Sequence, residues 1–426
     1  MQLMGRMGPS LGLSQAGVPR LSTATRTGPG FSRSQNGTSN RRRPHSRGPS
    51  VCHGEGLMLG LWRSLWVGVL GLALGGGAVG AQAQAEKTLN LYNWADYIGP
   101  DTIPSFEKAT GIKVNYDVFD SAELLQSKLL LGRTAYDVVV PSAAYVRNQI
   151  AAGIFQKLDK RRLPNLKQLD PALMAKLATI DPGNNYVVPW AWGTNGLGIN
   201  VQKVREILGP EAPLDSLALL FDPQYVSKLK ACGVSVLDSP GDMVSLAQAY
   251  LGRRTDQMTA EDLKVAFELL RRVRPYITQI NTTSYNNDLA QGDICLAAGY
   301  SGELTQAVRA SRAAGKPFEV RYVLPREGSV VWIDVMAVPT SAPHTDAAYR
   351  WINHVLDPQV SAGIVNQIMF PTAVPAASAH VRPEIRDNKA LYLDAAAIDR
   401  LGLATLGTFE INRQLNRMWL SFKSRH

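Results

Sequence analysis

From residue 87 onward, short apolar segments alternate regularly with segments of helical periodicity. The first unit contains three strands and three helices, predicted at 89–94, 101–110, 112–119, 121–132, 136–141 and in a helix that ends at Gly153. Ser121 is a typical helix N-cap, and Gly132 is a typical residue at a helix C-terminus. This order predicts a mostly parallel sheet with helices on both faces, which binds ligands beyond the carboxyl ends of its strands.

A second unit of the same kind begins near residue 233. Its predicted strands and helices follow in the order 233–237, 261–273, 294–298, 304–314, 330–338, 346–356 and 358–367. The Gly-rich segment 193–198 lacks the strand–glycine–helix order of a phosphate loop, so we interpret it as a chain crossing. A chain of 426 residues exceeds what one hydrophobic core usually organises. We therefore predict two α/β lobes with the binding cleft between them.

Residues 1–85 have the features of targeting segments. Residues 1–57 are rich in Arg, Ser, Gly and Pro and lack periodicity, so we expect a disordered leader. Residues 58–85 combine Arg63, a long uncharged stretch and a small-residue cleavage site near Ala83, which predicts a secretory signal peptide and a periplasmic protein. Because signal peptides begin at the N-terminus, we expect translation to start at Met58. The alternative is a retained membrane anchor, since the uncharged stretch is long enough to span a bilayer.

The distribution of charge and cysteine follows this division. Residues 1–85 account for +8 of the net charge of +10, so the folded part is nearly neutral, which excludes nucleic acid as the main partner. Export leaves Cys232 and Cys295, an even number in a compartment that permits disulfides. This favours their pairing. Two buried free thiols remain the alternative, because separation in sequence does not give the distance in space.

Motifs of catalysis are absent from the sequence after residue 85. It contains no HExxH, CxxC, GxSxG or GxxxxGK motif, and its four His residues are scattered. An enzyme on this scaffold would need a nucleophile–base pair or a metal cluster in the cleft. We therefore expect neither catalysis nor a cofactor.

Acidic and aromatic residues occur together where strands are predicted to end. Four segments have this character, at 94–97 (WADY), 238–242 (DSPGD), 299–303 (GYSGE) and 332–334 (WID). Each segment alone is explained by a helix cap or by core packing. Together they predict a site for an organic cation, because carboxylates pair with ammonium groups while ring faces attract the charge and cover methylenes. Several acids along one cleft would select a ligand with two or more amines.

From residue 88 to its end, the chain resembles the periplasmic spermidine/putrescine-binding proteins of bacterial ABC transporters, the putrescine branch in particular. The segments 91–114, 116–132, 136–142 and 287–303 carry this resemblance. It implies a two-lobe, type II (venus-flytrap) fold with a mixed, mostly parallel sheet in each lobe. Lobe 1 would comprise 86–194 and 325–369, and lobe 2 would comprise 195–324 and 370–426.

The resemblance also implies roles for individual residues. The aromatic box would consist of Trp94, Tyr97, Tyr300, Trp332 and Phe370. The partners of the amines would be Asp96, Asp242, Glu303 and Asp334, with a hydroxyl from Ser142. Similar putrescine binders join cysteines at the positions of Cys232 and Cys295. The implied protein is a monomeric receptor that delivers a polyamine to a membrane permease.

The sequence departs from the family pattern at several of these positions. Tyr300 and Glu303 stand where the family usually has Trp and Asp, and Asp242 stands where the putrescine branch usually has Glu. Ala95 lacks a hydroxyl that the family usually has, Trp332 is closer to the spermidine branch, and Phe370 replaces a Tyr. The choice among putrescine, cadaverine, spermidine and spermine therefore stays open. A sensor, or a receptor for another organic cation, is the alternative function on the same fold.

Overall fold

The computed structural model describes residues 87–132 and 134–424. The expected leader (1–57), the expected signal peptide (58–85) and Met58 lie outside the described residues. Within the described ranges, no helix has the length and apolar character needed to cross a membrane.

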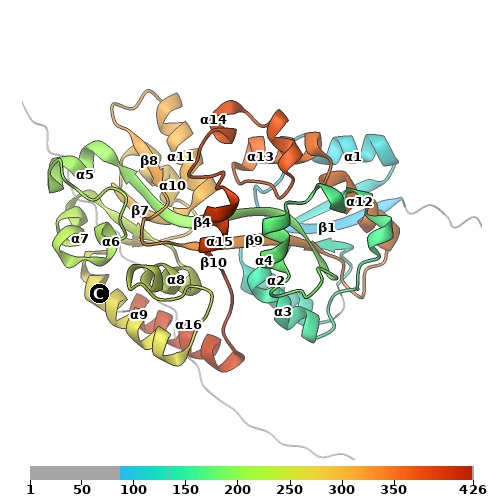
Figure 1. The fold of residues 1–426 in the computed structure, drawn as a ribbon, viewed down its shortest axis with the longest axis horizontal. Helices are drawn as coiled ribbons and strands as arrows, with labels where there is room; N and C mark the ends of the chain where they lie inside the picture. The colour runs from blue at the N-terminus through green and yellow to red at the C-terminus, as the bar shows by residue number, and fades with distance from the viewer. Residues whose placement is uncertain (1–86, 133, 425–426) are drawn as a thin grey trace, which may run out of the picture. The chain divides into compact units, whose positions relative to one another are not determined.

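A single mixed sheet runs through the described part of the chain (Figure 1). Its main path has the order β2-β1-β3-β9-β4-β7-β5-β6, and β10 and β8 pair with β9 and β4. In chain order the strands are β1 (Thr88–Trp94), β2 (Lys113–Phe119), β3 (Val138–Val139), β4 (Val187–Asn200), β5 (Val234–Val236), β6 (Gln279–Ile280), β7 (Leu296–Tyr300), β8 (Val320–Val323), β9 (Val330–Ala337) and β10 (Gly402–Leu403). The pairs β1–β2, β1–β3, β5–β6, β5–β7 and β9–β10 are parallel, and the pairs that involve β4 are antiparallel.

Strand β4 joins the two ends of the sheet. Its residues 187–194 pair with β9, whereas residues 195–200 pair with β7 and β8. All of its residues are buried, so polar backbone groups depend on this pairing for their hydrogen bonds. The expected crossing at 193–198 therefore occurs inside one continuous strand.

Helices fill the connections between the strands. They are α1 (Thr102–Thr110), α2 (Ala122–Leu130), α3 (Ala143–Ala151), α4 (Pro171–Leu177), α5 (Val201–Leu208), α6 (Ala218–Phe221), α7 (Pro223–Leu229), α8 (Pro240–Tyr250), α9 (Ala260–Val273), α10 (Tyr285–Gln291), α11 (Ser301–Ala313), α12 (Thr345–Val355), α13 (Pro358–Ile368), α14 (Pro383–Arg386), α15 (Ala395–Arg400) and α16 (Phe409–Lys423). In Figure 1, α1 and α12 lie at the β1 end of the sheet, and α5 and α7 lie at the β7 end.

Several predicted boundaries need correction. The strand predicted at 294–298 runs from Leu296 to Tyr300, and the helix predicted from 304 begins at Ser301, because Tyr300 has the extended backbone of an N-cap. The strand predicted at 136–141 pairs only at Val138–Val139. The predicted N-cap Ser121 does accept a hydrogen bond from a backbone N–H group of the first helical turn, and Asp357 caps α13 in the same way.

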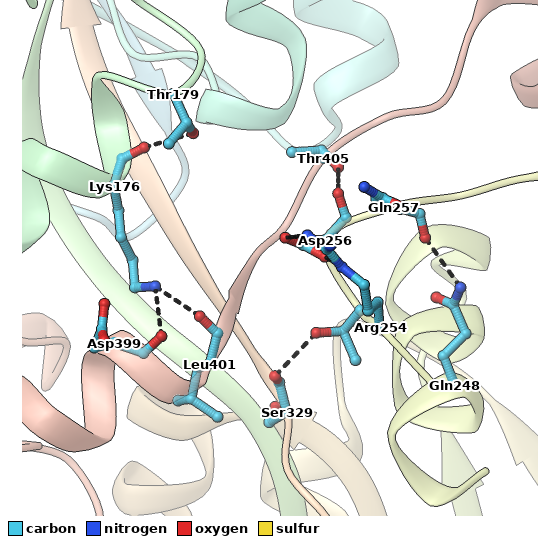
Figure 2. Close-up of polar contacts among 11 residues, drawn as sticks. Lys176, Thr179, Gln248, Arg254, Asp256, Gln257, Ser329, Asp399, Leu401 and Thr405 are labelled. Atoms are coloured by element: carbon cyan, nitrogen blue, oxygen red, sulfur yellow. Dashed lines mark hydrogen bonds and ion pairs between the residues drawn. The ribbon is translucent and has the colours of Figure 1, made fainter. Parts of the chain in front are cut away.

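The C-terminal segment provides a further connection between the two ends of the sheet. Strand β10 pairs with β9 at Gly402 and Leu403. Figure 2 shows that Lys176 of α4 donates to the carbonyl oxygens of Asp399 and Leu401, and that Thr405 donates to the carbonyl of Asp256. The segment is therefore hydrogen-bonded both to α4 and to the chain near Asp256. It also borders a cavity of about 540 Å³.

Cys232 and Cys295 form a disulfide that joins the end of a short helical turn to the start of the β7 region, with a sequence separation of 63 residues. We expect the double variant Cys232→Ala/Cys295→Ala to lose about 2–4 kcal/mol of unfolding free energy, because a cross-link of this span restricts the unfolded chain. Urea unfolding with and without a reductant measures the loss. The double variant serves as the control, since the reductant should not shift its midpoint. An equal midpoint for the oxidised protein and the variant would contradict this expectation.

Candidate ligand-binding site

Four of the five predicted aromatic residues form a continuous row of rings. Tyr97 packs edge-on against Phe370 at a centroid distance of 5.7 Å, and Phe370 packs against Trp332 at 4.9 Å. Trp332 continues the row to Tyr300 at 6.0 Å. These rings come from the loop after β1, the segment after α13, β9 and the end of β7. Residues far apart in the sequence thus build one aromatic wall.

The close approach of Phe370 depends on a glycine. A Cβ atom at Gly302 would lie 2.5 Å from the Phe370 ring, which is closer than real Cβ contacts allow. Gly302 lies in the first turn of α11, so the ring packs directly against the backbone of that turn. The glycine of the GYSGE segment therefore makes room for the Phe370 ring, next to the aromatic and acidic side chains of the same segment.

Asp334 is the most buried carboxylate of the predicted set, with 8% of its surface exposed. It lies on β9, and its backbone forms a bridge with the predicted hydroxyl donor Ser142. Burial raises the pKa of Asp334 to about 7, and the neighbouring Asp242 charge adds to the rise. The Tyr97 hydroxyl beside the carboxylate opposes part of this rise.

Glu303 lies in the first turn of α11 and accepts a hydrogen bond from the Tyr285 hydroxyl on Oε2. Desolvation raises the pKa of Glu303 to about 7, and the hydrogen bond from Tyr285 offsets part of that rise. The Glu303 charge also raises the pKa of both Tyr97 and Tyr300, so these groups lie within one electrostatic neighbourhood.

Asp242 lies in the first turn of α8 and is held by three donors. The Asn195 amide donates to Oδ1 at 2.8 Å. The hydroxyls of Ser239 and Tyr300 donate to Oδ2 at 2.6 and 2.8 Å. This carboxylate therefore has a fixed position, and its hydrogen bond with the Tyr300 hydroxyl holds the last ring of the aromatic wall in place.

Among the described residues, no side-chain hydrogen bond, ion pair or ring contact joins Trp94 or Asp96 to this cluster. Trp94 packs on Phe119 at a centroid distance of 4.6 Å. Asp96 is exposed and has a positive φ of 53°, and its charge acts on Tyr116. Trp94 is the last residue of β1, and Asp96 lies in the turn that leads to Tyr97, which the cluster does include.

Three side chains near the predicted residues were not expected from the sequence. Tyr285 of α10 donates a hydrogen bond to Glu303, and Asn195 of β4 donates one to Asp242. Tyr145 of α3 donates to Glu123 at 2.9 Å and experiences the Asp242 charge. No motif marks these residues, because each is an isolated polar side chain in an otherwise ordinary helix or strand. Only the spatial pairing of the segments reveals them.

The three carboxyl groups of the cluster have no cationic partner among the described residues. In the described parts of the chain, no Lys, Arg or His forms an ion pair with Asp242, Glu303 or Asp334. The described residues also contain no group of three or more His, Cys, Asp or Glu side chains that could hold a metal ion. Partly or fully buried acids beside aromatic rings are suited to an organic cation, which neutralises the charge and packs its carbon atoms on the rings.

Comparison with known proteins places the chain in a family. The family of bacterial extracellular solute-binding proteins matches residues 102–392. The putrescine-binding periplasmic protein SpuD of Pseudomonas aeruginosa is 42% identical over 357 residues, which cover 84% of this chain and 97% of SpuD. The putrescine-binding periplasmic protein PotF of Escherichia coli is 42% identical over 358 residues, with the same coverage of 84% and 97%.

A solved structure extends the similarity to the fold. The spermidine/putrescine ABC transporter substrate-binding protein PotD of Streptococcus pneumoniae aligns with a TM-score of 0.68 at 25% identity, covering 79% of this chain and 99% of PotD. This similarity confirms the predicted two-lobe α/β fold with a mixed sheet. The match along residues 102–392 and the identity to SpuD and PotF show that the chain belongs to the bacterial extracellular solute-binding proteins.

Proposed function

We propose that this protein is a periplasmic polyamine receptor that closes around its ligand and delivers it to the permease of an ABC importer. The observation that carries the proposal is the meeting of Asp242, Glu303 and Asp334 with an aromatic wall and with no cationic partner among the described residues. The names of SpuD and PotF, which are putrescine-binding proteins, support the same ligand class. The function is binding, and catalysis has no part in it.

In this proposal the ammonium groups of the ligand pair with the carboxylates, while its methylenes lie on Trp332 and Tyr300. Asp96 and Ser142 would act from lobe 1, and Asp242 and Glu303 from lobe 2, with Asp334 near the crossing. The exchange of β4 partners between Thr194 and Asn195 supports a division of the lobes there. Because the closed form gains contacts from both lobes, the ligand would favour closure. Trp94 would complete the box from the end of β1.

Several further features belong to this proposal. The receptor would act as a monomer, since one cleft per chain is sufficient, and it would have no nucleic-acid partner. Its place would be the periplasm, which the printed names of SpuD and PotF support. No cofactor is needed for capture and release.

Isothermal titration calorimetry tests the proposed function. The protein from residue 86 onward is unfolded and refolded to remove bound ligand, and then titrated with putrescine, cadaverine, spermidine and spermine. We expect saturable one-to-one binding of at least one of them. A folded protein that binds none would contradict the proposal.

Agmatine belongs in the same titration as a second candidate ligand. A relative from Pseudomonas aeruginosa that is 39% identical over 351 residues is named a putrescine/agmatine-binding protein. A guanidinium group can form two parallel hydrogen bonds with one carboxylate, which Asp334 and Glu303 could accept. Binding of agmatine in preference to every polyamine would assign the site to the alternative ligand class.

A further inference from the structure

Tyr285 is a fully buried residue that connects two of the carboxylates. Its hydroxyl accepts the backbone N–H of Tyr300 at 3.0 Å and donates to Oε2 of Glu303. Tyr300 in turn donates its side-chain hydroxyl to Asp242. One phenol therefore fixes Glu303 directly and Asp242 through Tyr300.

The path of the Tyr285 ring is built into the sheet. A Cβ atom at Gly299 would lie 2.2 Å from Cε2 of Tyr285, so the ring crosses β7 at the one position without a side chain. Gly299 pairs with Gly196 of β4, which fixes this position in the register of the sheet. The position of the Tyr285 hydroxyl at the end of β7 is therefore fixed by the packing of its ring against the sheet.

Glu303 needs such support more than an aspartate would. Its longer side chain has an additional rotatable bond, so its carboxylate samples more positions when it is unpartnered. Tyr285 occupies Oε2, and among the described residues no hydrogen bond engages Oε1. This arrangement leaves one oxygen available at a fixed place.

We propose that Tyr285 is a positioning residue that sets the distance between the Glu303 and Asp242 carboxylates, and with it the length of the diamine that the site prefers. The inference rests on the proposed polyamine function and deepens it. Two acids at a fixed separation can each bond an ammonium group only when the number of methylenes fits. A shorter or longer diamine then loses one charge-assisted hydrogen bond.

The direct test compares the wild-type protein with Tyr285→Phe in titrations with 1,3-diaminopropane, putrescine and cadaverine. Removal of the hydroxyl should weaken binding of the preferred diamine by about tenfold, because the ligand must then also order the freed Glu303 side chain. The affinity ratio between the best and the next diamine should fall to about threefold or less. Tyr349→Phe is the matched control, because Tyr349 is also buried and its hydroxyl also accepts a backbone N–H, from Asp159 at 2.7 Å. That variant should keep both the affinity and the ratio.

A pH profile separates positioning from a general loss of stability. The hydrogen bond from Tyr285 lowers the pKa of Glu303, so its removal should move the pH midpoint of diamine binding to higher pH. A variant that was merely loosened would bind all diamines less tightly and keep the wild-type midpoint.

Glu303→Asp provides a second route if Tyr285→Phe folds poorly. Its shorter side chain breaks the same hydrogen bond while Tyr285 stays in place, so it should also flatten the length preference. In a double-mutant cycle, adding Tyr285→Phe to Glu303→Asp should change the ratio no further.

Two results would overturn the inference. One is a wild-type protein that prefers one diamine, together with variants that keep its length ratio and its pH midpoint. The other is a double-mutant cycle in which Tyr285→Phe and Glu303→Asp change the affinity ratio between diamines independently of each other. If the wild-type protein binds no diamine at all, the proposed function itself fails, and the inference fails with it.

Discussion

Replacing Asp334 by Asn is expected to weaken putrescine binding by about 100-fold or more. Asp334 has 8% of its surface exposed and has no ion-pair partner among the described residues. An ammonium group bound there would lose the buried counter-charge that touches it while staying out of water. The amide keeps the size and shape of the carboxylate, so the loss reports the charge. Calorimetric titration of both proteins measures it.

Asp96→Asn is the informative comparison. The Asp96 carboxylate is exposed, so water screens its charge, and we expect its substitution to cost less than about tenfold in affinity. Thermal unfolding of both variants should show that each remains folded. An equal loss at Asp96 and Asp334, or no loss at Asp334, would mean that the amines are held elsewhere in the cleft.

Binding of putrescine should strengthen as the pH rises from about 5 to about 8. Burial raises the pKa of both Glu303 and Asp334 to about 7, so the ligand-free protein holds protons on them at pH 6. One ammonium group of the ligand would pair with Glu303 and the other with Asp242 and its neighbour Asp334, so binding favours the ionised forms. Each protonated acid lowers the affinity by roughly tenfold per pH unit below its pKa. Complex formation should therefore release about two protons at pH 6 and almost none at pH 8.

Titrations in buffers of different ionisation enthalpy count these protons. Asp334→Asn is the control, because it should release about one proton fewer at pH 6. Release that does not vary between pH 6 and pH 8 would contradict the assignment of these two acids to the ligand.

The same two groups set the sign of the effect of pH on stability. Their pKa is higher in the folded protein than in the unfolded chain, so the ligand-free fold binds more protons between about pH 4 and pH 7. Their contribution to unfolding free energy therefore decreases as the pH rises through this range. A bound polyamine reverses the trend, because it pairs with the ionised carboxylates.

The alternation of strands and helices could be predicted from the sequence because both signals are local. The predicted bounds of the strands β1 and β2 and of the helices α9 and α12 lie within a few residues of the observed bounds, because apolar spacing defines these elements. Helices α8 and α16 were not predicted. The sequence of α8 is buried over most of its length, so it lacks the polar face that reveals a surface helix.

The site was only partly accessible from the sequence. The pattern of acids and aromatics at strand ends fits Asp242, Tyr300 and Glu303, which lie at or just after the ends of β5 and β7. It was wrong for Trp332 and Asp334, which lie inside β9 and reach the cluster through the pairing of β9 with β4. No sequence pattern predicts a role for Tyr285. Its ring packs against Gly299 of β7, and that contact depends on the pairing of segments that are distant in the sequence. A contact of Trp94 or Asp96 with the ligand depends on the position of the end of β1 and the following turn relative to the bound ligand, which local sequence patterns do not encode.

A crystal structure of the refolded protein with putrescine tests the central claim most directly. The account predicts that each amine nitrogen lies within about 3 Å of a carboxylate oxygen from the set Asp242, Glu303 and Asp334, with the carbon chain on Trp332 and Tyr300. A ligand bound away from these carboxylates, with both amines in contact with other groups, would contradict it.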